Sequence, residues 1–78
     1  MAKATADPVE LDLRGLKCPL PAIKVSRALE RAPKGTRLRV LATDPMSAID
    51  IPHAVAKAGA RLLSQDRTDR RLLFEIER

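Results

Sequence analysis

The spacing of apolar residues changes twice along this chain, from every second position to every third or fourth, and this alternation limits the possible folds most. Residues 9–13 alternate between apolar and acidic side chains, which predicts a strand with one buried face. From Pro19 or Pro21 to about Ala32, apolar residues recur at helical spacing and basic residues fall opposite them. A strand therefore gives way to an amphipathic helix close to residue 18.

The second half of the chain repeats this succession and then adds two strands. Residues 37–42 predict a strand that ends at Asp44, and a helix should follow from Ser47 to about Ala58. Ser47 followed by Asp50 fits a short capping box at the start of that helix. Pro52 then lies in or near the first turn, where a proline is tolerated. Closing strands are predicted at 61–65 and 71–77, around a polar turn at 67–70.

The order of elements is therefore βαβαββ, and it predicts an α/β two-layer sandwich. Each β-α-β unit should be a right-handed crossover, which places both helices on one face of a mixed four-stranded sheet. The other face carries charged residues at alternate positions and can meet water directly. We expect a single domain over residues 9–78, preceded by a flexible N-terminal segment at residues 1–8.

The length and the cysteine content exclude several classes of protein. The chain has 78 residues with one cysteine and one histidine, so it can form neither an intrachain disulfide nor a closed four-ligand zinc site. We therefore expect no metal and no cofactor. The sequence has no apolar run of about 18 residues and no apolar stretch of signal-peptide type in residues 1–8. We expect a cytoplasmic monomer that does not enter a membrane.

Positive charge is concentrated in the first half of the chain. The net charge is +5, and the half that ends at Arg39 holds nine basic and four acidic residues, against six of each afterwards. An acidic partner or an RNA would fit this excess, but the chain has one Phe and neither Trp nor Tyr, so we do not expect direct nucleic-acid binding. Lys24, Arg27 and Arg31 share a helix face that is either solvated or a docking surface for an acidic partner.

Cys18 is the residue most suited to covalent chemistry. It lies where the first strand meets the first helix, and a helix N-terminus with nearby cations such as Arg14 and Lys17 favours the thiolate. Pro19 and Pro21 remove amides that would otherwise bind an anion there, which predicts a moderately activated, outward-facing thiol. The alternative is that Cys18 is a small apolar filler and that the prolines merely mark the helix start.

Acidic residues of the second half are candidates for a cleft around this thiol. Parallel neighbouring strands end at the same edge of a sheet, where ligand sites of α/β proteins collect. Asp44 with Pro45, and Asp50 with Pro52, could line one wall there. Asp44 fits a turn residue that bonds its own backbone equally well. His53 is interpreted as a surface histidine, because nothing in the sequence places it near the cysteine.

Three short strings carry a resemblance to a known family. They are Leu13-Arg14-Gly15-Leu16-Lys17-Cys18-Pro19-Leu20-Pro21, Thr43-Asp44-Pro45 and Asp50-Ile51-Pro52. Together they resemble the TusA family of small sulfur carriers, also described as SirA-like, over nearly the whole chain from Val9. The resemblance implies a two-layer βαβαββ fold and gives Gly15, Pro19 and Pro21 a place in the motif that positions the cysteine.

The resemblance also implies a reaction. In the family, the cysteine of the C-P-x-P string takes a persulfide sulfur from a cysteine desulfurase or a rhodanese-type enzyme and passes it to an acceptor protein. Carried over, that role belongs to Cys18 alone, and the protein would act as a relay and not as a stand-alone enzyme. Members of the family serve tRNA thiolation, molybdenum cofactor synthesis, selenium handling or thiosulfate metabolism. A small basic RNA-binding or regulatory module, in which the thiol is not essential, is the alternative.

Overall fold

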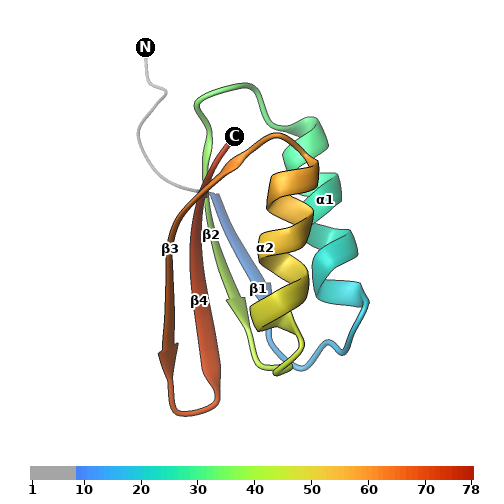
Figure 1. The fold of residues 1–78 in the computed structure, drawn as a ribbon, viewed down its shortest axis with the longest axis vertical. Helices are drawn as coiled ribbons and strands as arrows, with labels where there is room; N and C mark the ends of the chain where they lie inside the picture. The colour runs from blue at the N-terminus through green and yellow to red at the C-terminus, as the bar shows by residue number, and fades with distance from the viewer. Residues whose placement is uncertain (1–8) are drawn as a thin grey trace.

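A computed structural model describes residues 9–78, and the predicted N-terminal segment at residues 1–8 lies outside the described residues. Six elements follow one another in the predicted βαβαββ order (Figure 1). They are β1 (Val9–Leu13), α1 (Leu20–Arg31), β2 (Arg37–Ala42), α2 (Ser47–Lys57), β3 (Arg61–Thr68) and β4 (Arg71–Glu77).

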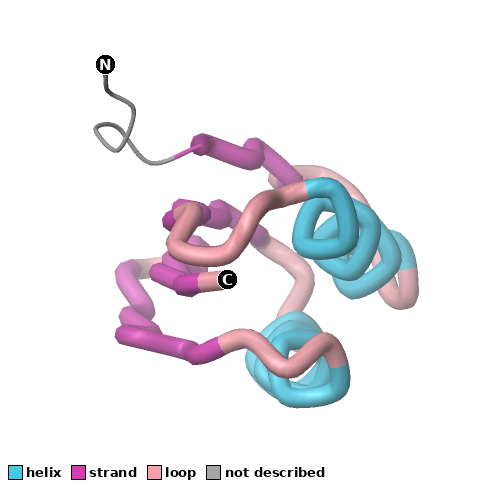
Figure 2. Tube along the Cα trace, turned by 90° about the horizontal axis from the view of Figure 1, so that it is seen from above, coloured by secondary structure: helices cyan, strands magenta, loops and turns pink. Residues whose placement is uncertain are grey.

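The strands form one mixed sheet, with the order β1-β2-β4-β3. Strands β1 and β2 are parallel, whereas β4 pairs antiparallel with both β2 and β3. Seen from above, the two helices lie together on one side of the sheet (Figure 2). The predicted two-layer sandwich is therefore confirmed.

The core lies between the sheet and the two helices, as the apolar spacing predicts. Phe74, Leu29 and Ile51 are its largest fully buried side chains. The opposite face of the sheet is charged and exposed: the Arg39 guanidinium lies 3.7 Å from a Glu10 oxygen and 3.5 Å from a Glu75 oxygen. Ion pairs exposed in this way stabilise a fold only slightly, so burial under the helices dominates.

The structure settles the start of α1, which the sequence left open, and corrects the predicted end of β3. Helix α1 begins at Leu20, with Pro19 as its N-cap after a cis Cys18–Pro19 peptide bond, and Pro21 is buried against the core. Strand β3 continues to Thr68, three residues beyond the predicted end, because the hairpin closes on a tighter turn than expected. Asp69 in that turn has a positive φ of 54°, which an aspartate tolerates.

The predicted capping box at the start of α2 is wrong. Ser47 is the first helical residue, and its Oγ is buried without a hydrogen-bond partner among residues 9–78. The N-cap is Met46, without a side-chain cap bond, and Asp44 satisfies two amides just before and at the helix start: its carbonyl accepts the Ser47 N–H at 2.9 Å and its Oδ1 accepts the Met46 N–H at 3.0 Å. The carboxylate of Asp50 is left free for another partner.

Pro52 lies in the second turn of α2, not in the first, and the helix continues through it. A proline has no N–H, so the Ala48 carbonyl four residues earlier loses its helical donor. The side chain of Gln65 in β3 replaces that donor, because its Nε2 lies 3.2 Å from the Ala48 oxygen. Strand β3 thus completes the turn of α2 that carries Asp50.

Candidate functional site

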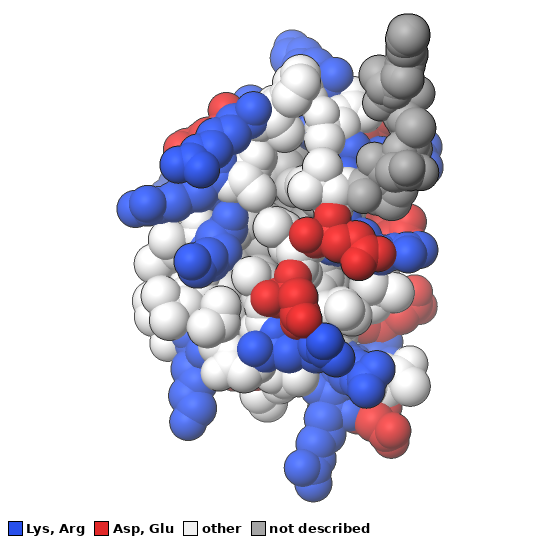
Figure 3. Space-filling model, turned by 180° about the vertical axis from the view of Figure 1, so that it is seen from behind, with Lys and Arg blue, Asp and Glu red and all other residues white. Residues whose placement is uncertain are grey.

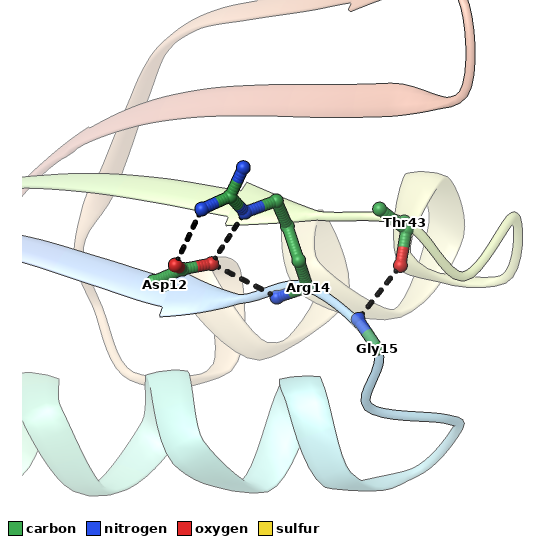
Figure 4. A network of polar contacts seen from close by, with 4 residues as sticks. All are labelled: Asp12, Arg14, Gly15 and Thr43. Carbon is green, nitrogen blue, oxygen red and sulfur yellow. Dashed lines mark hydrogen bonds and ion pairs between the residues drawn. The ribbon is translucent and has the colours of Figure 1, made fainter.

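Two loops meet at the edge of the sheet where β1 and β2 end, at the bottom of Figure 1. We call residues 14–19 the cysteine loop and residues 43–46 the acceptor loop. The Gly15 N–H donates to Thr43 Oγ1 at 2.9 Å (Figure 4), and the Cys18 N–H donates to Asp44 Oδ2 at 2.5 Å. The acceptor loop therefore holds the backbone of the cysteine loop at two points, the amides of Gly15 and Cys18.

Gly15 has a structural reason to be glycine. Its φ is +84°, in the left-handed region where side chains with a Cβ are disfavoured. No atom lies within 4 Å of the place where a Cβ would stand, so the constraint is the backbone conformation alone. This turn carries the chain from β1 toward Cys18.

Asp44 bonds both to its own loop and to the backbone of Cys18. One carboxylate oxygen bonds within its own loop, to the Met46 N–H, and the other holds the Cys18 N–H. These two hydrogen bonds, with a smaller effect of the Lys17 charge, hold the pKa of Asp44 below its ordinary value. The residue therefore forms the turn and also holds the backbone of Cys18, while it borders a separate hollow beside the acceptor loop and not the groove at the sulfur.

The Cys18 thiol donates to Asp50 in α2, across 32 positions of sequence. The distance from Sγ to Asp50 Oδ2 is 2.9 Å. This hydrogen bond, followed by partial desolvation and the negative charges of Asp50 and Asp44, raises the pKa of Cys18 above its ordinary value. The expectation of a thiolate favoured by nearby cations is therefore wrong, because the nearest charges are carboxylates.

Arg14 explains part of this difference. Its guanidinium pairs with Asp12, from Nε to Oδ1 at 2.8 Å and from Nη2 to Oδ2 at 2.7 Å (Figure 4). The pair lowers the pKa of Asp12 to about 2. A guanidinium engaged in this way stabilises Asp12 and does not act on the sulfur.

A groove of about 720 Å³ leads away from Cys18 between α1 and α2. Cys18 and Asp50 lie where the two helices begin, whereas Arg31 and Lys57 lie in their last turns. The rise of a helix places Arg31 roughly 16 Å along α1 from Leu20. The groove is acidic beside the sulfur and mainly basic at its far end, where Glu30 is the exception.

The predicted site residues divide between this groove and its surroundings. Arg27, Arg31 and Pro19 line the groove, whereas Lys24 is exposed on α1 outside the groove lining. Lys17 and Pro45 border a separate shallow hollow beside the acceptor loop. Pro52 is half-buried and borders neither of these two hollows, so its described role is confined to α2.

Sequence reasoning missed the α2 side of the groove. His53, Ala54 and Lys57 line it together with Asp50. Their positions are i, i+3, i+4 and i+7 from Asp50, which is the spacing of one helix face. That spacing would have placed His53 beside the cysteine if Asp50 had first been assigned to the thiol.

Exposed apolar side chains surround the start of both helices. Leu20, Ile23, Met46 and Ile49 are 44%, 42%, 46% and 66% exposed. Leu20 follows Cys18 by two positions, Ile23 lines its groove, and Ile49 precedes Asp50. The thiol therefore lies beside an apolar surface that a partner protein could cover.

The face of the molecule seen from behind carries charges of both signs. In the view from behind, basic side chains stand mainly at the upper left and the bottom, with acidic and uncharged surface between them (Figure 3). On this face the described residues form no continuous basic stripe of the kind that follows a nucleic-acid backbone. Residues 9–78 contain no helix able to span a membrane.

The site defines a class of protein whose chemistry takes place on a single sulfur. Cys18 is the one free thiol and is exposed. Within residues 9–78, no three His, Cys, Asp or Glu side chains gather in a way that could hold a metal ion. The site offers an exposed thiol that is hydrogen-bonded to a carboxylate, and a thiol in this position can exchange sulfur with another thiol-bearing molecule once it ionises.

Comparison with known sequences identifies the family. The family model described as Sulfurtransferase TusA matches residues 9–78, so the chain belongs to the TusA family of sulfur carriers. The sulfur carrier protein TusA of Allochromatium vinosum is 33% identical over 69 residues, which cover 88% of this chain and 91% of that protein. The TusA protein of Pseudomonas syringae is also 33% identical over 69 residues, covering 88% of this chain and 82% of that protein.

One relative is much longer than this chain. A protein of Aquifex aeolicus, provisionally named a sulfur carrier, is 34% identical over 68 residues. The match covers 87% of this chain and 34% of the Aquifex protein, so the chain spans about a third of that relative. The similarity therefore concerns the TusA-like unit.

Proposed function

We propose that this protein carries sulfur as a persulfide on Cys18, accepting it from one protein and delivering it to another. The observation that carries the proposal is the single exposed thiol, held by the acceptor loop at the open end of a groove, in a chain of the TusA family. The alternative of an RNA-binding module is not favoured, because the family is one of sulfur carriers.

The reaction needs only the atoms of two cysteines. The Cys18 thiolate attacks the terminal sulfur of a donor persulfide, and the S–S bond of the donor breaks. The donor cysteine leaves as a thiolate and takes up the proton that Cys18 lost. Delivery to an acceptor repeats the exchange in the forward direction, so the transfer requires neither an oxidant nor a reductant.

The chemistry also indicates the partners. A donor must present a persulfide, which fits a cysteine desulfurase or a rhodanese-type enzyme, and the acceptor must offer a thiol or another nucleophile. A carrier with one reactive thiol must stay reduced between transfers, which fits the reducing environment of the cytoplasm. Each complex has to form and separate quickly, so weak, electrostatically steered contacts suit it.

Intact mass spectrometry tests the carrier function directly. After incubation with a cysteine desulfurase and free cysteine, the wild-type protein should gain one sulfur atom that dithiothreitol removes. Cys18→Ser should keep the circular dichroism spectrum of the wild type and gain nothing. If the serine variant still acquires labile sulfur, Cys18 is not the carrier. A gel shift with tRNA at two salt concentrations tests the alternative.

The basic end of the groove is the proposed docking surface for acidic partners. Arg27 and Arg31 line the groove that leads to Cys18, whereas Lys24 does not, so the three cations are separable. Reversing Arg27 and Arg31 together should slow transfer from a persulfurated donor about tenfold at low salt, since each exposed pair is worth about 0.2–1 kcal/mol. Lys24→Glu is the matched control and should have a smaller effect. Equal rates in all variants would place the docking surface elsewhere.

A further inference from the structure

Two carboxylates accept the two hydrogen-bond donors of Cys18. Its own S–H is committed to Asp50 Oδ2, at 2.9 Å, and the backbone N–H of the same residue is committed to Asp44 Oδ2. Both carboxylates come from the second half of the chain, from the acceptor loop and from α2. The sulfur transfer described above uses only the atoms of two cysteines and does not require Asp50.

The charged groups that face the thiol do not cancel these carboxylates. Arg14 is paired with Asp12, and Arg31 and Lys57 lie in the last turns of their helices. The nearer charged or titratable groups are Asp44 and Lys17 from the two loops, Arg27 from α1 and His53 from α2. Lys17 acts mainly on Asp44, whose pKa it lowers.

A carboxylate that accepts a hydrogen bond from a thiol stabilises the protonated form and repels the thiolate. The free protein should therefore rest with a protonated, weakly nucleophilic sulfur, which agrees with the raised pKa of Cys18. Protection of this kind matters for an exposed thiol, because thiolates are the form that oxidants and electrophiles attack.

We propose that Asp50 restrains Cys18 in the free carrier, and that a sulfur donor releases it by placing a Lys or Arg side chain against Asp50. The proposal rests on the carrier function proposed above. An ion pair with Asp50 would withdraw the acceptor from the S–H and remove the nearest negative charge. Cys18 then ionises and attacks, and its proton ends on the departing donor cysteine.

The distribution of charge along the groove indicates which charges a sulfur donor should carry around its persulfide cysteine. The Asp50 carboxylate lies at the end of the groove that holds the sulfur, and three cations, Arg27, Arg31 and Lys57, outnumber Glu30 in the part that leads away from it. A complementary donor segment carries a basic residue next to its persulfide cysteine and acidic residues further along the chain. Asp50 is then a positioning residue that acts through the thiol, and it selects the donor.

Small disulfides of different charge provide a test that needs no sulfur donor. Cystamine carries an ammonium group beside each sulfur, hydroxyethyl disulfide is neutral, and dithiodipropionate is anionic. Wild-type protein should react with cystamine severalfold faster than with the neutral disulfide, after division by the rate of a free cysteine peptide with the same reagents. The anionic disulfide should be slowest. A wild-type protein without this order overturns the proposal without recourse to any variant.

Two variants assign the preference to Asp50. Asp50→Asn and Asp50→Ala should lower the midpoint of the iodoacetamide alkylation profile and raise the rate at pH 7, because each unit of pKa raises the thiolate fraction about tenfold while the nucleophilicity of the thiolate falls by less. Both should lose the preference for cystamine. Asp66→Asn, an exposed aspartate of β3, is the matched control and should keep both properties. An unchanged alkylation midpoint in both Asp50 variants would show that Asp50 does not restrain the thiol.

Failure of the carrier function would look different. In that case wild-type Cys18 would gain no sulfur from any desulfurase, whereas the disulfide and alkylation results would stand as they are. Conversely, normal sulfur loading with no charge preference would leave the carrier function intact and overturn the role of Asp50.

Discussion

The cysteine loop and the acceptor loop both join a parallel strand to a helix, yet they contribute opposite halves of the same contacts. The cysteine loop donates, through the Gly15 and Cys18 amides. The acceptor loop receives, through Thr43 Oγ1 and an Asp44 carboxylate oxygen. One loop holds the reactive atom and the other determines where it lies.

The groups that raise the pKa of Cys18 therefore come from the half of the chain that lacks the cysteine. The cations near Cys18 in the sequence predicted a thiolate, but the carboxylates of Asp44 and Asp50 are the charges that raise its pKa. The motif around the cysteine supplies the backbone path, and the second half supplies the electrostatics.

Removal of the Asp44 carboxylate should have the largest effect on the pair of loops. Asp44→Ala removes the acceptor of the Cys18 N–H and also that of the Met46 N–H. We expect a clearly lower thermal midpoint and faster alkylation of Cys18, because the loop is freed and a negative charge is lost. Asp66→Ala is the control. An unchanged midpoint would mean that the two loops hold their positions without this tie.

Two glycines with similar φ values test whether the left-handed conformation at Gly15 affects the reactivity of Cys18. Gly15 and Gly35 have φ values of +84° and +92°, and neither has an atom within 4 Å of a would-be Cβ. Each change to Ala should therefore destabilise the fold by about 1–2 kcal/mol. Only Gly15→Ala should also change the alkylation rate of Cys18. If both variants change the alkylation rate equally, the backbone conformation at Gly15 has no particular influence on the reactivity of Cys18.

The Thr43 hydroxyl makes a smaller contribution. Thr43→Val keeps the shape of the side chain but leaves the Gly15 N–H to water, which should cost about 0.5–1.5 kcal/mol in denaturant unfolding. Thr36→Val, in the loop before β2, is the matched control, because Thr36 bonds through its backbone. If the two variants lose the same stability, the side-chain bond to Gly15 contributes nothing.

Acid titration should show the smallest effect. The pKa of Asp44 is lowered in the fold, so its contribution to stability is full above the ordinary value of 3.8 and is lost as the pH falls through the folded value. The Cys18 amide resonance should follow this titration with a midpoint below 3.8. A midpoint at or above that value would mean that the Asp44 tie is absent in solution.

Most of the fold could be predicted because it depends on local spacing. Alternation over residues 37–42 and 71–77 is enough to identify strands that bury Val40 and Phe74. The start of α2 at Ser47 was predicted correctly, but its capping was not, since Ser47 has the right residue type for a cap. Asp44 accepts the hydrogen bonds of the Met46 and Ser47 amides, through its carboxylate and its carbonyl.

The candidate site was less predictable because its contacts join distant positions. The hydrogen bond from Cys18 to Asp50 joins residues 32 positions apart, and no local sequence pattern predicts it. The pairing of Arg14 with Asp12 is local, at a separation of two residues, and alternation along a strand could have suggested it. The predicted thiolate is therefore wrong for two reasons. The prediction lacks the long-range contact of Cys18 with Asp50, and it treats Arg14 as a free cation although Arg14 pairs with Asp12.

The position of β4 has a consequence for how the protein is made. Strand β4 follows β3 in the sequence but lies between β2 and β3 in the sheet, and it supplies Leu72, Phe74 and Ile76 to the core. Until the ribosome has released this strand, β3 has no neighbour to hold Gln65 against the α2 carbonyl of Ala48. A nascent or truncated chain would then present Cys18 without its carboxylate partners in place. If Asp50 restrains the thiol as proposed, such a chain should be more open to oxidation than the folded protein, and truncation before residue 71 would test this by alkylation of Cys18.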